Sequence, residues 1–314
     1  MGGVTAVSIV FQDTAVSGPT TAHKTLRIVG HQNWIPFGRE RLLRLFCDPG
    51  RAVDVPFDVD FFGARYTGTL ANFIDWSVYF YGAYSSHELM LLRDVARGLR
   101  ASGQSIHFCD VGANVGQHSL FMSMHADRVS SFEPFPRVCK KLRALLEHNC
   151  IDNVRVFPVA LGDADGELDY FEPDESNLGT GSFAAAPGNF AGRVLRLPVR
   201  CGDRFVADND LAPVAILKID VEGFEASVLR GLKTLLKRDR PIILMELSDQ
   251  SRRAFGDCTR FLDHLFDHPR IFDVGAKRCS PSYRLSSFHF DDTDELLVIP
   301  SELTDALAPR LGLS

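Results

Sequence analysis

A strand that ends on an acid and turns through two glycines into a helix constrains this chain more than any other feature. Residues 107–121 read HFCDVGANVGQHSLF, where Asp110 ends an apolar run and Gly112 and Gly116 follow in the turn. Such a turn lets a ligand approach the backbone and the positive end of the next helix closely. A dinucleotide would require glycine in place of Asn114, because its pyrophosphate lies against the backbone there. We therefore expect either a compact ligand that carries an amine or a tight turn that binds nothing.

From about residue 85 onward, the apolar pattern predicts alternating helices and strands. Ser85 and Glu88 have the spacing of a capping box, before a helix that Gly103 ends. Strands are expected at 105–110, 128–135, 154–162, 214–220 and 241–247, helices at 116–126, 137–149, 223–238 and 252–266, and a closing pair of strands at 270–275 and 295–300. This alternation is typical of βαβ units. It predicts an α/β fold with a doubly wound, mostly parallel, seven-stranded Rossmann-like sheet.

Two regions interrupt the alternation. Residues 164–200 contain GELDYFEP, the glycine-rich stretch SNLGTGS and VLRLPVR, which predicts an inserted β-hairpin with a mobile tip. Residues 1–84 alternate apolar and acidic side chains in VDVPFDVDF and concentrate aromatic ones in DWSVYFYGAY. We expect 1–84 to be an N-terminal extension that serves a substrate pocket or oligomerisation, beside a main domain over 85–314.

Acids that follow two further strands indicate which ligand the turn binds. Glu133 ends the second strand, where a carboxylate can accept hydrogen bonds from both hydroxyls of a ribose. Asp163 follows the third strand, where a carboxylate can accept from an adenine amino group. Because parallel strands bring their carboxyl ends to one edge, the turn and the acids describe an adenosine pocket with room for an amino acid. The ligand that combines these parts is S-adenosylmethionine.

Five segments in order resemble a known family. DVGANVG, FEPFP, NVRVFPVALGD, LKIDVEGFEASVLRGLKTLL and RPIILMEL resemble the FkbM-type methyltransferases over roughly residues 85–250. The resemblance implies a class I methyltransferase fold, S-adenosylmethionine as cofactor, and a hydroxyl of a sugar, polyketide or similar specialised metabolite as methyl acceptor. It implies cofactor-binding roles for Asp110, Gly112, Asn114, Gly116, Glu133 and Asp163. The chain departs from the family in GAYSSHE, since Ser85 stands where members often have an acid.

Three charged residues lie where the fourth strand ends. In LKIDVEG, Lys218, Asp220 and Glu222 alternate with apolar residues, and a strand buried on both faces carries such charges only where it emerges. We predict that they are catalytic, because a positioned carboxylate can take the proton of an acceptor hydroxyl during in-line methyl transfer. The alternative is structural, with Asp220 as a helix N-cap, Glu222 as a first-turn acid and Lys218 as their ion partner.

Further groups fall near the same edge. Glu246 ends the fifth strand and, with Asp220 and Glu222, offers oxygen ligands for a divalent metal. The spacing has no metal-binding signature, so we predict no metal. His118 is a second candidate base, although a single helical His is more often structural. The aromatic residues of 76–84 either roof an acceptor pocket or, as is commoner, pack the N-terminal region onto the sheet.

The composition of the chain limits its expected partners and cellular location. The 34 basic and 40 acidic residues give a net charge of −6, which offers no reason to expect nucleic acid as a partner. Seven cysteines without a CxxC pair favour reduced thiols and a cytoplasmic location. Neither a signal peptide nor an apolar run of membrane-spanning length is recognisable, so we expect no membrane partner. The expected partner is a small-molecule substrate, and a homodimer is left open. Two other functions stay open, an NAD-dependent oxidoreductase and a non-catalytic binding protein.

Overall fold

A mixed sheet of eight strands organises the residues that the structure describes. The computed structural model describes residues 18–32, 39–51, 54–173, 181–183, 192–211, 213–276 and 280–313. The strand order is β12-β11-β13-β10-β9-β3-β4-β5. The parallel strands are β3 (His107–Val111), β4 (Arg128–Phe132), β5 (Val154–Phe157), β9 (Ile216–Ile219) and β10 (Ile242–Glu246). The antiparallel pairs are made by β13 (Glu295–Pro300), β11 (Pro269–Ala276) and β12 (Tyr283–Ser287).

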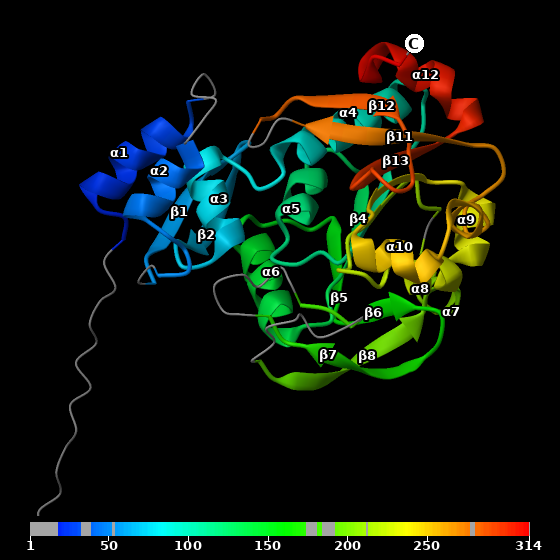
Figure 1. Ribbon diagram of the computed structural model, residues 1–314, viewed down its shortest axis with the longest axis horizontal. Helices are drawn as coiled ribbons and strands as arrows, with labels where there is room; N and C mark the ends of the chain where they lie inside the picture. The colour runs from blue at the N-terminus through cyan, green and yellow to red at the C-terminus, as the bar shows by residue number, and fades with distance from the viewer. Residues whose placement is uncertain are drawn as a thin grey trace, which may run out of the picture.

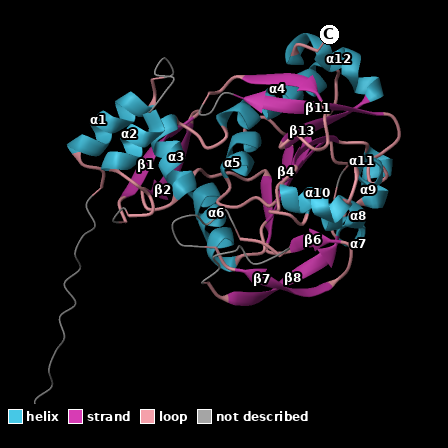
Figure 2. Cartoon of the chain, in the orientation of Figure 1, coloured by secondary structure: helices cyan, strands magenta, loops and turns pink. Residues whose placement is uncertain are grey.

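The predicted fold class is confirmed, with one more strand than the sequence predicted. The expected closing pair is β11 with β13, and β12 adds an eighth strand because the chain folds back on β11 as a hairpin. Helices cover both faces of the sheet, as Figure 2 shows. Side chains alternate along each strand, so that Phe108 and Val129 enter one core while Cys109 and Val111 enter the other.

Each face has its own set of helices. One core includes side chains of α4 (Ser86–Ala101), α5 (Gln117–Ser123) and α12 (Ser301–Leu311). The opposite core includes those of α7 (Gly202–Asp208), α8 (Glu225–Gly231), α9 (Lys233–Asp239), α10 (Asp249–Phe255) and α11 (Cys258–Leu262). α6 (Pro136–His148) packs beside β5 at the end of the sheet. The doubly wound arrangement places the turn after β3 and the end of β9 at the same edge.

The predicted third strand, 154–162, is divided between two sheets. β5 ends at Phe157, and β6 (Ala160–Gly162) instead pairs with β8 (Val194–Cys201), which is antiparallel to β7 (Gly166–Phe171). Pro158 follows β5 directly and has no N–H to continue the ladder. The expected hairpin is therefore present as β7 and β8, below the main sheet in Figure 1. Residues 176–180 of its predicted tip lie outside the described residues.

The N-terminal region is a helical and β-hairpin unit at one end of the molecule (Figure 1). It contains α1 (Thr21–Gly30), α2 (Arg39–Phe46), β1 (Pro56–Phe61), β2 (Ala64–Thr69) and α3 (Phe73–Tyr81). The predicted strand in VDVPFDVDF is β1, whose side chains alternate between exposed and buried. Trp76, Tyr79 and Phe80 are buried in the core that also contains α4 and α5. These aromatic residues thus pack the region onto the sheet, and a domain boundary at residue 84 stays a proposal.

The start of α4 differs from the sequence prediction in its cap. Ser85 precedes the helix as expected, but its backbone is left-handed (φ 47°) and its side chain makes no capping hydrogen bond. The capping box predicted with Glu88 is therefore wrong, and both residues face the site described below. Within the described ranges, no helix has the length and apolar character needed to cross a membrane.

Candidate functional site

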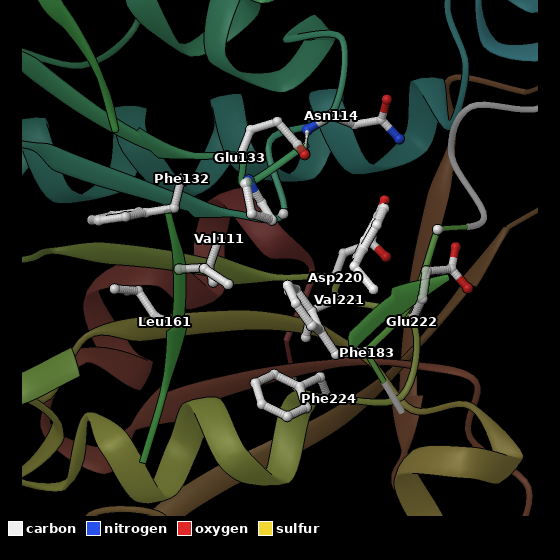
Figure 3. A pocket seen from close by; sticks show the side chains of 15 residues that line it. Val111, Asn114, Phe132, Glu133, Leu161, Phe183, Asp220, Val221, Glu222 and Phe224 are labelled. Carbon is white, nitrogen blue, oxygen red and sulfur yellow. Dashed lines mark hydrogen bonds between the residues drawn. The ribbon is translucent and has the colours of Figure 1, made fainter. Parts of the chain in front are cut away.

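Two adjoining cavities open at the carboxyl edge of the parallel strands. The first lies between the glycine turn, Glu133 and the three-stranded sheet. The second lies between the ends of β9 and β10 and the start of α4. Asn114, Asp220 and Glu222 line both cavities. Figure 3 shows the first cavity, with Asp220 and Glu222 on the side away from Phe132 and Leu161.

The two glycines of the turn are required by the backbone and by close packing. Gly112 has φ +84°, and a Cβ atom there would lie 1.8 Å from the carbonyl oxygen of Asp220. Gly116 has φ +90°, and a Cβ atom there would lie 2.1 Å from a methyl carbon of Leu142. Contacts within the chain therefore explain both glycines before any ligand is considered. Asn114 also has a positive φ, 49°, and is the turn residue whose side chain borders both cavities.

Glu133 lies at the end of β4 with its carboxylate against the glycine turn. One oxygen accepts a hydrogen bond from the Asn114 N–H at 3.0 Å, and the other accepts from the Phe135 N–H at 2.8 Å. Burial outweighs these two donors and raises the pKa of Glu133 to about 7. Each oxygen keeps a second lone pair, so the carboxylate can accept two further hydrogen bonds from a diol in the cavity.

Aromatic rings that the sequence analysis did not select form a wall of the first cavity. Tyr170 of β7, Phe183 and Phe224 line it, with 5.0 Å between the ring centroids of Tyr170 and Phe183 and 5.5 Å between those of Phe183 and Phe224. Such a wall suits a flat heterocycle. The three rings come from separate segments of the chain, so no spacing in the sequence could have identified them together.

Asp163 makes contacts other than the one expected. Its carboxylate accepts hydrogen bonds from the Arg230 side chain at 2.8 Å and from the Ser227 hydroxyl at 3.0 Å. It does not line the cavity, where Ala160 and Leu161 of β6 lie instead. The displacement follows from the division of the third strand, because the chain has already left the main sheet before it reaches Asp163. The structure therefore gives no support to an adenine contact by this residue.

Lys218 and Asp110 are buried where β3 and β9 meet, and the partly exposed Asp220 completes this group of charges. The ammonium of Lys218 donates to Asp220 at 3.0 Å and lies 3.9 Å from Asp110, which also accepts from the Ser119 hydroxyl at 2.6 Å. Asp110 is fully buried and Lys218 is 3% exposed. Burial alone would lower the pKa of Lys218, but Asp220 and Asp110 outweigh it and raise the pKa above its usual value. Lys218 thus remains charged beneath the border of the two cavities.

Glu222 and Glu246 complete the acidic border of the second cavity. One ligand oxygen from each of Asp220, Glu222 and Glu246 lies within 4.8 Å of the others. Burial, and then the charge of Asp220, raise the pKa of Glu222 to about 7. The same two causes raise the pKa of Glu246. The sequence-predicted residues Lys218, Asp220 and Glu222 are therefore brought together, and Glu246 joins them.

The alternative that gives these residues a purely structural role is correct for Lys218 and wrong for Asp220. α8 begins at Glu225 with Phe224 as its N-cap, so Asp220 is not a cap. Glu225 itself accepts from the N–H groups of Val221 and Gly223, at 3.1 and 3.2 Å. Lys218 is the ion partner of Asp220, as that alternative expected. The carboxylate of Asp220 has no role in starting the helix and borders both cavities.

The start of α4 forms the outer wall of the second cavity. Tyr84, Ser85, His87 and Glu88 line it. The His87 ring contacts Glu295 at 2.8 Å, and the Nε2 atom of His118 lies 3.1 Å from Glu88. His118 therefore lies behind the wall and is not one of the residues that line the cavity.

Comparison with known proteins identifies the class. The model of the methyltransferase FkbM domain matches residues 110–274, more than half of the chain. The chain belongs to the FkbM methyltransferase family. Its members take a methyl group from S-adenosylmethionine, so the predicted family and cofactor are confirmed. No curated protein matches the chain.

Solved structures with a similar fold are remote in sequence. Methyltransferase FkbM from Methylobacillus flagellatus KT is 16% identical, with a TM-score of 0.42 over 62% of this chain and 43% of that one. SMU.1697c from Streptococcus mutans, solved in complex with SAH, is 13% identical, with a TM-score of 0.36 over 62% of this chain and 87% of that one. The chain thus spans less than half of the Methylobacillus protein, and the family assignment rests on the domain match.

Proposed function

We propose that this FkbM-family chain transfers a methyl group from S-adenosylmethionine to a hydroxyl of a small specialised metabolite, such as a sugar or a polyketide. The observation that carries the proposal is the position of the Asp220 carboxylate, which borders both cavities and is held by a buried lysine. One cavity has the groups that adenosine requires, and the other has carboxylates for a hydroxyl. The border between them is where a methyl group would pass.

The first cavity fits the cofactor by the chemistry of its walls. We assign the ribose diol to Glu133, whose two oxygens each retain an acceptor site. The aromatic wall at Phe183 and Phe224 receives the adenine. Asp110, Gly112, Asn114 and Gly116 shape the turn along which the methionine part lies. The negative charges of Asp220 and Glu222 favour a sulfonium beside them.

The proposed chemistry takes place in the second cavity. S-adenosylmethionine, when bound, supplies an electrophilic methyl group attached to a positively charged sulfur. The Asp220 carboxylate would orient the acceptor hydroxyl and accept its proton, so that the hydroxyl oxygen could act as the nucleophile toward that methyl group, with the neutral thioether as leaving group. Lys218 fixes that carboxylate and Glu222 stands beside it. A positioned base of this kind contributes about 10²- to 10⁴-fold.

Incubation with methyl-labelled S-adenosylmethionine and a panel of hydroxylated metabolites tests the proposal. We expect label in a product whose mass spectrum and NMR show a methyl ether. Transfer to a nitrogen or carbon atom would contradict the O-methylation part alone. Cofactor binding without transfer to any member of the panel would favour the non-catalytic alternative.

A metal-assisted mechanism predicts different effects of chelation and of substitutions on activity. Asp220, Glu222 and Glu246 together offer oxygen ligands, so such a mechanism predicts that EDTA abolishes activity and that Glu246→Gln is as damaging as Asp220→Asn. We expect activity to persist in EDTA, because Lys218 already compensates the charge of Asp220. Loss of activity in EDTA that Mg²⁺ restores would replace our mechanism.

A further inference from the structure

The wall of the second cavity is an irregular segment of chain. It comprises residues 82–88, which run from the end of α3 into the first turn of α4. Gly82 and Ser85 both have left-handed backbones, with φ of 89° and 47°. A segment that turns in this way lacks a regular hydrogen-bond ladder to fix its shape. Backbone hydrogen bonds hold its two ends, from the Gly82 N–H to the Val78 carbonyl and from the Glu88 N–H to the Ser85 carbonyl. Side chains that reach the segment from elsewhere add to these bonds between the two ends.

Gln117 supplies one such connection. The Tyr84 N–H donates to the Gln117 side-chain oxygen at 2.7 Å, and the Gln117 amide donates back to the Tyr84 carbonyl at 2.6 Å. Gln117 is only 3% exposed. Both polar ends of one buried side chain are thus used on a single residue of the wall, which fixes the place and orientation of Tyr84.

His118 supplies the second connection. Its Nε2 atom lies 3.1 Å from the Glu88 carboxylate, with 10% of the His118 side chain and 14% of the Glu88 side chain exposed. Burial would raise the pKa of Glu88, but the contact with His118 outweighs it and holds the pKa well below its usual range. Glu88 is therefore a fixed negative charge in the wall.

The two connections start where the glycine turn ends. Gln117 and His118 directly follow Gly116 and are the first residues of α5, and Asn114 of the same turn lines both cavities. We infer that Gln117 and His118 are positioning residues that couple occupation of the cofactor cavity to the shape of the acceptor cavity. This inference rests on the proposed function for the assignment of the two cavities. It predicts that the cofactor binds first and orders the wall for the acceptor.

Hydrogen exchange with S-adenosylhomocysteine as the probe tests this coupling without an identified acceptor. In the wild-type chain, the probe should slow exchange both in peptides covering 110–116 and in peptides covering 82–90. In Gln117→Met, which keeps the volume but removes both hydrogen bonds, protection of 110–116 should remain. Protection of 82–90 on adding the probe should fall at least threefold.

Asn153→Leu is a matched control at the other end of α5. The Asn153 amide donates to the carbonyls of Ser123 and Ala126 at 2.9 and 3.1 Å, so this change also removes two side-chain bonds to the backbone. It should lower the melting temperature comparably and leave the effect of the probe on 82–90 unchanged. A merely structural role for Gln117 predicts that the two variants behave alike.

The outcomes separate the inference from the proposed function. If the probe does not protect 82–90 in the wild type, or protects it equally in Gln117→Met, the coupling is refuted whatever the chain methylates. If the coupling is seen but no hydroxyl compound is methylated, the coupling stands and the proposed reaction fails. If Gln117→Met does not fold, Gln117→Glu, which retains the acceptor for the Tyr84 N–H, is measured against the same two criteria.

Discussion

Lys218 is the cation on which the charges of the site depend. It is buried between Asp110 and Asp220, so each carboxylate would be left uncompensated without it. Removing one partner from a buried ionic group typically costs about 3–5 kcal/mol. The sequence could identify Lys218 because a charge in an otherwise apolar strand is rare. It could not show that Asp110 shares the same cation, since that depends on the pairing of β3 with β9.

We predict that Lys218→Met lowers the free energy of unfolding by about 3–5 kcal/mol and also slows methyl transfer. Urea denaturation measures the first effect. The control is Lys140→Met, because Lys140 is an exposed residue of α6, where we expect a change of about 0.5 kcal/mol or less. Equal losses in the two variants would contradict the role given to Lys218.

The Glu133 carboxylate makes cofactor binding depend on pH. Its pKa in the free protein is raised to about 7, so half of the molecules carry a proton there near neutrality. Only the ionised form accepts from both ribose hydroxyls, so affinity should rise as pH rises through that value, with release of a proton. The free energy of unfolding of the free protein depends on pH in the opposite direction. The contribution of Glu133 to it is present below the pKa that this carboxyl has in the unfolded chain, and is lost as pH rises through about 7.

We therefore predict that affinity for S-adenosylhomocysteine rises about tenfold between about pH 6 and pH 8. Calorimetry at several pH values measures this. Glu133→Gln should remove the pH dependence and weaken binding by about 1.5–3 kcal/mol at high pH. A pH dependence that persists in Glu133→Gln would assign it to another group.

The glycine turn is the element whose geometry the sequence predicted best. Its strand, turn and helix lie at the expected positions, because a glycine pattern and a change of period are local signals. The third strand was predicted badly, because its apolar pattern continues past Pro158 while the partner strand changes from β4 to β8. The aromatic wall and the role of Ser85 also depend on contacts between distant segments. The local sequence pattern predicts helices and strands, whereas tertiary packing determines which of their residues come into contact.

We predict that Gly112→Ala destabilises the chain far more than Gly103→Ala. Both positions have positive φ, +84° and +79°, but a Cβ atom at 112 would meet the Asp220 carbonyl whereas one at 103 has nothing within 4 Å. The control should cost about 1–2 kcal/mol, the usual left-handed penalty. Gly112→Ala should cost at least twice that and move the end of β9. Similar melting temperatures for the two variants would contradict this prediction, because they would show that the turn accommodates a Cβ atom at residue 112 at little cost.

At the scale of the whole molecule, the two faces of the sheet and the N-terminal unit converge on one edge. The N-terminal aromatic residues share a core with α4 and α5, so binding at that edge should stabilise the entire fold. A ligand at 100 times its dissociation constant adds about 2.7 kcal/mol. We predict that S-adenosylhomocysteine raises the melting temperature in a single transition and that NAD does not. Stabilisation by NAD would revive the oxidoreductase alternative, and a second, unshifted transition would show that residues before 85 unfold separately.

The central claim is that the Asp220 carboxylate assists transfer at the border of the two cavities. Asp220→Asn keeps the size of the side chain and removes its basic charge, while the cofactor contacts at Glu133 and the aromatic wall are untouched. The most direct measurement compares this variant with the wild type for turnover of labelled methyl at saturating acceptor and for calorimetric affinity toward S-adenosylhomocysteine. We predict a turnover lower by about two to four powers of ten, with affinity within about threefold of the wild type. Full turnover in Asp220→Asn would contradict the account.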